Sequence, residues 1–159
     1  MGKRQVKIAP RAVVTDEALD ANVLIYAVDR SAEHHVESKE WLDSALTDRE
    51  TVLMPWVSLL AFVRLVSHPS IFEHPLPVHQ ALDVVDGWLA APAVVVPQPD
   101  ERHVQRLRAL LQATGRGANL VNDGHLAAMA LQYRATIVTF DSDFGRFPCV
   151  QWQRPGTTS

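Results

Sequence analysis

Short apolar runs that alternate with longer amphipathic segments constrain the fold of this chain more than any other feature of its sequence. The runs "TVLM" (51–54), "AVVVPQP" (93–99) and "ATIVTF" (135–140) have the length and the residue types of buried strands. An apolar approach that ends at Asp20 predicts a further strand before them. Because strands separated by helices form parallel sheets, we predict an α/β fold with a central, mostly parallel sheet of four to five strands and helices on both faces.

The segments between these runs carry apolar residues at helical spacing. We predict helices over 22–29, 31–48, 56–69, 78–92, 100–115 and 119–134. Segment 56–69 is apolar on nearly every side, which is typical of a buried helix. The final run, "CVQWQ" (149–153), predicts a short edge strand.

Length and composition bound the class of protein. A chain of 159 residues fits one domain, which we expect to cover 15–154, between a basic N-terminal tail at 1–14 and a C-terminal tail at 155–159. The single cysteine cannot form an internal disulfide, and no run reaches the ~20 apolar residues of a membrane span, so we expect a cytoplasmic protein that does not bind membranes. The net charge of −3 is not that of an ordinary nucleic-acid binder, which is usually basic.

Acidic residues stand where the predicted strands end. Asp20 closes the first run, Asp141 follows run 135–140, and Asp143 comes two residues later. Asp123 opens a helix whose small residues predict close packing against the sheet: Gly124, Ala127, Ala128 and Ala130. Because the carboxyl ends of parallel strands share one edge of a sheet, and because this packing brings Asp123 toward that edge, we expect these carboxylates to converge. Carboxylates ~4 Å apart repel by roughly 4 kcal/mol per pair at an effective dielectric of ~20, so they need a cation, and hard oxygen ligands favour Mg²⁺ or Mn²⁺.

Each acid also has a purely structural explanation, which stays open. Asp20 could cap the following helix, Asp123 could gain from a helix dipole, and the last two could be turn residues. A phosphotransferase with Asp20 as nucleophile is a further alternative, but Asn22 stands where its signature needs a second acid. The sequence contains no GxSxG motif, no Walker A loop and no Rossmann glycine fingerprint.

Four motifs together resemble a known family. They are "LDANVLIYA" (19–27), "PWVSLLAFVRLVSHP" (55–69), "NLVNDGHLAAMAL" (119–131) and "TFDSDFGRFP" (139–148). In this order and spacing they resemble PIN-domain ribonucleases, specifically the VapC-type toxins of bacterial toxin–antitoxin pairs, over about 18–155. The resemblance implies a PIN-like domain and metal-dependent endonucleolytic cleavage of RNA.

The resemblance also implies roles for particular residues. Asp20, Asp123 and Asp141 match three acids that surround Mg²⁺ in the family, where Mn²⁺ can substitute, and Asp143 matches an additional acid beside the last of them. We therefore expect these four to be the catalytic and metal-binding residues. The expected substrate-binding residues are two polar side chains near the acids and three arginines that flank the motifs, each of which could instead form a surface salt bridge: Asn22, Thr139, Arg64, Arg116 and Arg146.

One family position departs from the pattern, because Ala61 stands near where a glutamate is expected. Three explanations are open: the three aspartates and Asp143 suffice, Glu40 reaches in from the preceding helix, or the site is weakened. The third would make the protein a weakened or inactive PIN-like module that binds RNA or a protein, which is our alternative function.

The resemblance implies partners as well. They are an RNA substrate, with tRNA as the class it suggests, and a VapB-type antitoxin. It further implies a homodimer and a toxin–antitoxin hetero-oligomer. The residues themselves do not identify the RNA that is cut.

Overall fold

The strands of this computed structural model, which describes residues 16–47, 51–115 and 117–157, form a single parallel sheet. Within the described residues the sheet has five strands in the order β3-β2-β1-β4-β5, and every pair of neighbours is parallel. The strands are β1 (Glu17–Leu19), β2 (Val52–Leu53), β3 (Val94–Val95), β4 (Thr136–Val138) and β5 (Trp152–Gln153). The predicted α/β fold and the C-terminal edge strand are confirmed, whereas the predicted tail at 1–14 and Arg116 lie outside the described residues.

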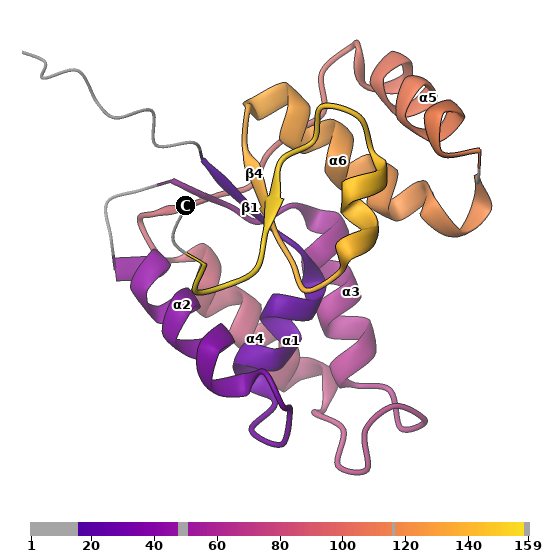
Figure 1. The fold of residues 1–159 in the computed structure, drawn as a ribbon. Coiled ribbons are helices and arrows are strands. Elements are labelled where there is room, and N and C mark those ends of the chain that lie inside the picture. The colour runs from indigo at the N-terminus through magenta and orange to yellow at the C-terminus, as the bar shows by residue number, and fades with distance from the viewer. Residues whose placement is uncertain (1–15, 48–50, 116, 158–159) are drawn as a thin grey trace, which may run out of the picture.

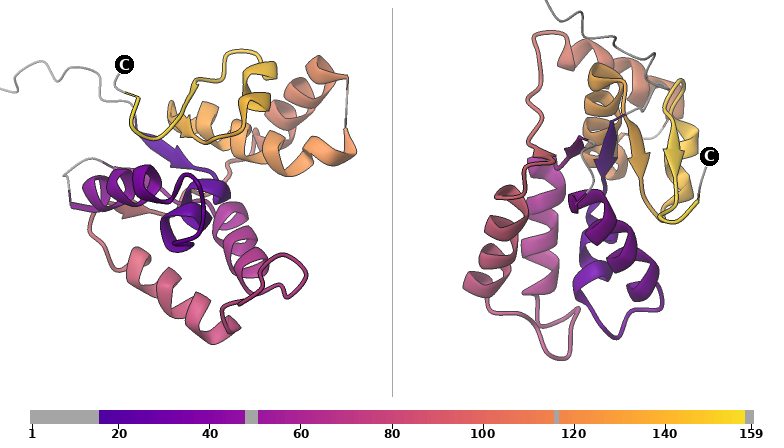
Figure 2. Two further views of the ribbon diagram at one scale, coloured as in Figure 1. Left: turned by 60° about the horizontal axis from the view of Figure 1, so that its bottom comes forward. Right: turned by 90° about the vertical axis from the view of Figure 1, so that its left-hand side faces the viewer.

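Helices cover both faces of the sheet, and the two groups lie on opposite sides of the strands in Figures 1 and 2. One face carries α1 (Ala21–Val28), α2 (His35–Thr47), α3 (Trp56–Val66) and α4 (Val78–Leu89). The other carries α5 (His103–Thr114) and α6 (Val121–Tyr133), with the short 3₁₀ helices η1 (Ala118–Leu120) and η2 (Ser142–Arg146). None of the helices described here is long and apolar enough to cross a bilayer.

The alternation of side chains along the strands explains the two layers. In β1, Ala18 packs toward α5 and α6, and Leu19 packs toward α1 and α3. Ile137 and Val138 divide in the same way on β4. Successive residues of a strand point to opposite faces of the sheet. Because these short strands carry apolar residues on both sides, they contribute side chains to the hydrophobic core on each face.

The prediction that segment 56–69 is buried on all sides is wrong. The side of α3 that contains Leu59 and Phe62 is fully buried, but Leu60 is 60% exposed and Trp56 is 46% exposed. The helix packs against α1, α4 and α6, and these neighbours leave one of its sides uncovered.

The start of α5 also differs from its prediction, which placed it at residue 100. The Asp100 carboxylate accepts a hydrogen bond from the Arg102 backbone N–H at 3.0 Å and pairs with the Arg106 guanidinium. The acid therefore holds the turn that precedes the helix, and α5 begins at His103. The predicted glycine stop is present, since Gly115 adopts the left-handed conformation with φ of 63°.

The small residues of α6 pack against two different partners. Ala127, Ala128 and Ala130 are buried in the core between α6 and the sheet, as their size predicted. Gly124 instead faces α5, where an added Cβ would lie 3.0 Å from Leu107 Cδ1 and 3.0 Å from Leu111 Cδ2. The close approach at Gly124 thus joins two helices rather than a helix and the sheet.

Gly124→Ala is expected to leave the protein about 1–3 kcal/mol less stable than Gly87→Ala, because the new methyl group overpacks the α5–α6 contact. Gly87 lies within α4 and an added Cβ there would meet nothing within 4 Å. The control substitution should therefore raise the free energy of unfolding by about 0.5–1 kcal/mol, the helical gain of alanine over glycine. Urea denaturation of both variants measures the difference, and equal stabilisation would contradict the tight contact.

Candidate functional site

The ends of β1 and β4 deliver the first acidic residues to one edge of the sheet. Asp20 follows β1 with extended backbone angles of φ −83° and ψ 152°, and its N–H donates to the Val138 carbonyl of β4. Its Oδ1 accepts the Ala21 N–H at 2.7 Å, so Asp20 is also the N-cap of α1. The structural explanation of this residue is therefore correct, and it leaves the second carboxylate oxygen to other partners.

Thr139 and Asn22 hold the second oxygen of Asp20. The Thr139 hydroxyl donates to Asp20 Oδ2 at 2.8 Å and accepts the Asp141 N–H at 2.9 Å. Asn22 Nδ2 lies 3.2 Å from the same Oδ2, and Asn22 Oδ1 accepts the Phe140 N–H at 3.3 Å. Thr139 is 0% exposed, so its side chain orients two acids from within the protein. The predicted substrate-binding role of Thr139 is therefore wrong, because no part of its side chain is open to a substrate.

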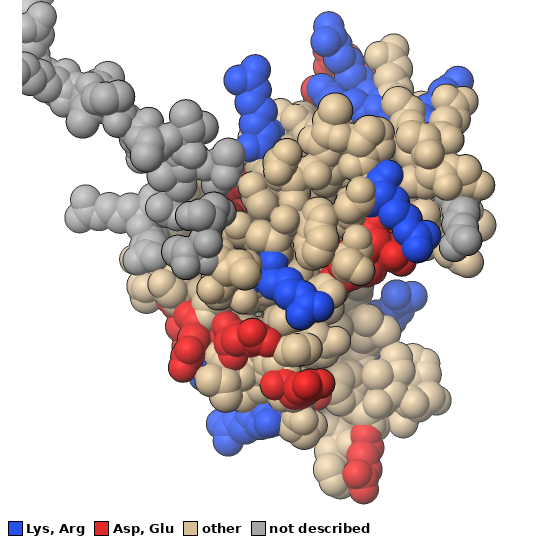
Figure 3. Space-filling model, in the orientation of Figure 1, with Lys and Arg blue, Asp and Glu red and all other residues tan. Residues whose placement is uncertain are grey.

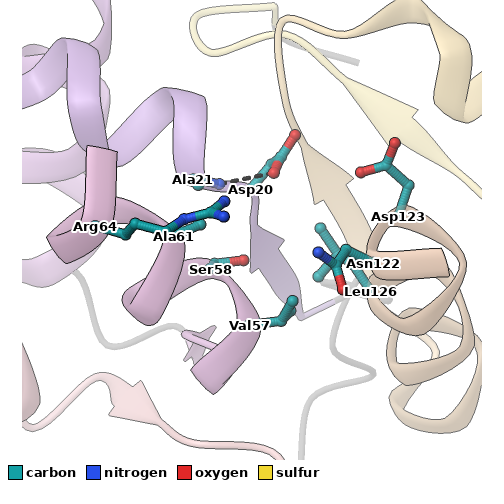
Figure 4. Close-up of a pocket in the computed structure, with 9 residues that line it drawn as sticks. All are labelled: Asp20, Ala21, Val57, Ser58, Ala61, Arg64, Asn122, Asp123 and Leu126. Atoms are coloured by element: carbon teal, nitrogen blue, oxygen red, sulfur yellow. Dashed lines mark hydrogen bonds between the residues drawn. The ribbon is translucent and has the colours of Figure 1, made fainter. Parts of the chain in front are cut away.

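A pocket of about 170 Å³ opens between α3 and α6 beside Asp20 (Figure 4). Asp20 and Asp123 line it from opposite sides, the latter from the first turn of α6. The wall from α3 is anchored by Ser58, whose hydroxyl donates to the Leu19 carbonyl at 2.7 Å. The full lining is Asp20, Ala21, Val57, Ser58, Ala61, Arg64, Asn122, Asp123 and Leu126.

Burial and neighbouring acids raise the pKa values of Asp20 and Asp123. Burial, together with the negative charges of Asp20, Asp141 and Asp143, raises the pKa of Asp123 to about 6. Burial also raises the pKa of Asp20, against the opposing hydrogen bonds from Thr139 and Ala21. The charges of the other three predicted acids therefore act on Asp123, and ionising Asp123 is unfavourable there without a cation.

Asp141 is the N-cap of η2 and Asp143 lies within η2, and neither of them lines this pocket. Asp141 Oδ1 accepts the Asp143 N–H at 2.8 Å, which caps η2. Asp143 pairs with Arg146 at 3.3 Å, and both side chains are about half exposed. In the part of the chain that the structure describes, no three His, Cys, Asp or Glu side chains are already grouped so that they could hold a metal ion.

The remaining predicted residues take different places. Arg64 lines the pocket, and its side chain extends past Ala61 toward Asp20 (Figure 4). Glu40 is exposed on α2 and does not line the pocket, so the structure gives no support to the explanation in which it replaces the missing glutamate. Asn122 lines the pocket but was missed, because its only sequence signal was its position next to Asp123.

Charged side chains of both signs are interspersed on the face shown in Figure 3. Basic side chains there are separated by acidic and uncharged ones, in agreement with the net charge of −3. Binding of a phosphate backbone on this face would therefore depend on a few local cations rather than on a broad basic surface.

Known proteins with similar sequences belong to one family. Residues 18–148 match the family model of the PIN domain. Ribonuclease VapC37 of Mycobacterium tuberculosis is 52% identical to this chain over 137 residues, which cover 86% of this chain and 95% of the relative. Ribonuclease VapC31 of the same organism is 33% identical over 137 residues, or 86% of this chain and 96% of the relative.

Solved structures share the fold at low sequence identity. VapBC-1 from nontypeable Haemophilus influenzae matches with a TM-score of 0.62 and 20% identity, covering 90% of this chain and 100% of that chain. VapC20 of Mycobacterium tuberculosis, described as a sarcin–ricin loop cleaving toxin, matches with a TM-score of 0.63 and 15% identity, covering 86% of this chain and 99% of that chain.

Proposed function

This chain belongs to the PIN-domain family as a VapC-type ribonuclease toxin, and we propose that it cleaves RNA with a divalent cation held by its acidic pocket. The observation that carries the proposal is the pocket between α3 and α6, which Asp20 and Asp123 both line and where the Thr139 hydroxyl fixes the Asp20 carboxylate. The raised pKa of Asp123, which burial and three neighbouring acids bring to about 6, agrees with it. A group of partly buried carboxylates that repel one another fits a hard cation with oxygen ligands.

The residues that would hold the cation are Asp20, Asp123 and Asp141, with Asp143 assisting directly or through water. A bound Mg²⁺ or Mn²⁺ ion lowers the pKa of a water molecule and offsets the negative charge of the phosphate. Thr139 and Asn22 act as positioning residues, because their hydrogen bonds fix the Asp20 carboxylate. Arg64 is the proposed phosphate contact, since it lines the same pocket and an arginine binds phosphate through paired N–H groups.

Cation binding should stabilise the protein more at neutral pH than at acidic pH. The folded-state pKa of Asp123 is about 6 against an ordinary value of 3.8, so its folded form binds protons more tightly than its unfolded form. Without a cation, the contribution of Asp123 to stability falls as the pH rises from 3.8 to about 6, and it stays low at higher pH. We therefore expect Mg²⁺ to raise the melting temperature clearly at about pH 7.5 and little at about pH 4.5, where Asp123 is protonated.

The same melts of Asp123→Asn provide the control for this pH dependence. The variant cannot ionise at this position, so the difference between the two pH values should shrink. A Mg²⁺ effect of equal size at both pH values in the unmodified protein would contradict a cation site at Asp123.

For the substrate and partner, we propose structured RNA, with tRNA as the class that the family resemblance suggested, and a VapB-type antitoxin. The similarity of the fold to chains from VapBC assemblies supports the antitoxin. We also propose that the protein forms a homodimer and acts in the cytoplasm. The substrate can be tested by inducing the protein in cells and sequencing the RNA 5′ ends that appear. We expect cuts in tRNA that leave 5′-phosphate ends. Cuts in ribosomal RNA would change the proposed substrate class, and the absence of new ends would contradict the proposed function.

Ala61→Glu tests the alternative of a weakened or inactive module. Ala61 lines the pocket beside Asp20 and Asp123, so a carboxylate there adds an oxygen ligand. If the site is weakened, its affinity for Mg²⁺ should increase roughly tenfold, because affinity follows ligand charge. Isothermal titration measures the change. An unchanged affinity would favour a complete site without this glutamate, and no Mg²⁺ binding by the unmodified protein would favour the inactive module.

A further inference from the structure

Aromatic side chains and one arginine gather around Phe140, which lies between Thr139 and Asp141. The His34 ring stacks on the Phe140 ring with centroids 4.4 Å apart and planes at 15°. The Tyr26 ring meets Phe140 edge-on at 5.4 Å, and the Arg154 guanidinium carbon lies 5.9 Å from its centroid. These residues come from α1, the α1–α2 loop, the segment after β4 and the segment after β5, so the tertiary fold brings them together.

This aromatic cluster (Tyr26, His34, Phe140 and Arg154) is linked directly to the acidic pocket. The Phe140 N–H donates to Asn22 Oδ1, and the Asn22 amide lies 3.2 Å from Asp20 Oδ2. The next residue along the chain is Asp141. The backbone of Phe140 is therefore part of the hydrogen-bond network that holds the Asp20 carboxylate.

The cluster is held in place but remains partly open to solvent. The His34 imidazole pairs with Glu37, and the neighbouring His35 ring bonds the Tyr26 carbonyl at 2.8 Å, which fixes the loop against α1. The His34 side chain is nevertheless 33% exposed, and Arg154 is exposed. An open ring on a fixed stack, next to a cation, is the arrangement that binds a flat aromatic ligand bearing a phosphate.

We propose that this aromatic cluster is a nucleobase subsite, where an unpaired base next to the scissile phosphate extends the His34–Phe140 stack and Arg154 contacts the adjacent phosphate. The inference rests on the proposed RNA cleavage and adds to it the requirement for an unpaired nucleotide. Stacking on a ring tolerates any base, so the subsite selects loops and single strands rather than one sequence.

The test uses single-stranded RNA of mixed sequence with one 2-aminopurine, whose fluorescence falls when it stacks, placed at successive positions. The protein carries Asp123→Asn so that the RNA is not cut. We expect quenching at a restricted position, loss of that quenching in His34→Ala with about tenfold weaker binding, and recovery of both in His34→Trp. His79→Ala, an exposed histidine on α4, is the matched control and should change neither.

A second measurement changes the RNA rather than the cluster, so the loss that it measures does not depend on how a cluster variant folds. An abasic site at the quenched position should weaken binding about as much as His34→Ala does, and the two losses should not add. Quenching that survives His34→Ala, or equal affinity for the abasic RNA, would overturn the subsite. Failure of the proposed function would give a different result from failure of the subsite. In that case the unmodified protein would quench the probe but would not cleave RNA in the presence of Mg²⁺.

Discussion

Asp123→Asn is expected to lower Mg²⁺-dependent RNA cleavage by at least about a hundredfold, because a bound cation supplies several kcal/mol of charge stabilisation in the transition state. The same substitution should raise the melting temperature of the cation-free protein at neutral pH. Burial and three nearby acids raise the pKa of Asp123 to about 6, so its ionised form is unfavourable in the folded state. Initial cleavage rates and thermal melts of one preparation measure both effects.

The opposite signs of these two effects distinguish a binding-site residue from a structural one. Asp83→Asn, at an exposed acid of α4, is the matched control and should change neither quantity. Asp20→Asn should lose cleavage without the gain in stability, since Asp20 caps α1 and accepts the Thr139 hydroxyl. Cleavage retained in both Asp20→Asn and Asp123→Asn would exclude the proposed mechanism.

Thr139→Val is expected to reduce cleavage by about 10- to 100-fold, although the Thr139 side chain is completely buried. Its hydroxyl bonds Asp20 Oδ2 at 2.8 Å and the Asp141 N–H at 2.9 Å, and valine keeps the shape while leaving both groups without this partner. The free energy of unfolding should fall by about 1–3 kcal/mol. The main kinetic loss should be in kcat and in the affinity for Mg²⁺, because the substitution disturbs the acids rather than the RNA contacts.

A pH profile tells this positioning role apart from simple destabilisation. The Thr139 hydrogen bond opposes the rise that burial causes in the pKa of Asp20, so its removal should move the acidic limb of the cleavage profile to higher pH. Thr139→Ser retains the hydroxyl and should restore both the rate and the profile. A variant that loses stability but keeps the profile of the unmodified protein would contradict the positioning role.

Much of the fold could be predicted because its signals are local. The runs that end at Asp20 and before Asp141 are apolar and short, and the segments between runs have helical spacing, so the parallel sheet and its helices followed from neighbouring residues. The position of these two acids followed as well, since the carboxyl ends of parallel strands meet at one edge. Errors arose where local pattern does not specify the partner, as at Leu60, which is exposed, and Gly124, which faces α5.

The sequence by itself thus determined the order of strands and helices along the chain and the edge of the sheet where Asp20 and Asp141 lie. Both depend on residues that are adjacent in the chain. Only the tertiary structure decided which side chains orient those acids. Thr139 reaches Asp20 across 119 positions, and His34 meets Phe140 from the α1–α2 loop. Such contacts arise when two segments pack together, and the spacing of residues within one segment does not predict which residues of the other it will contact.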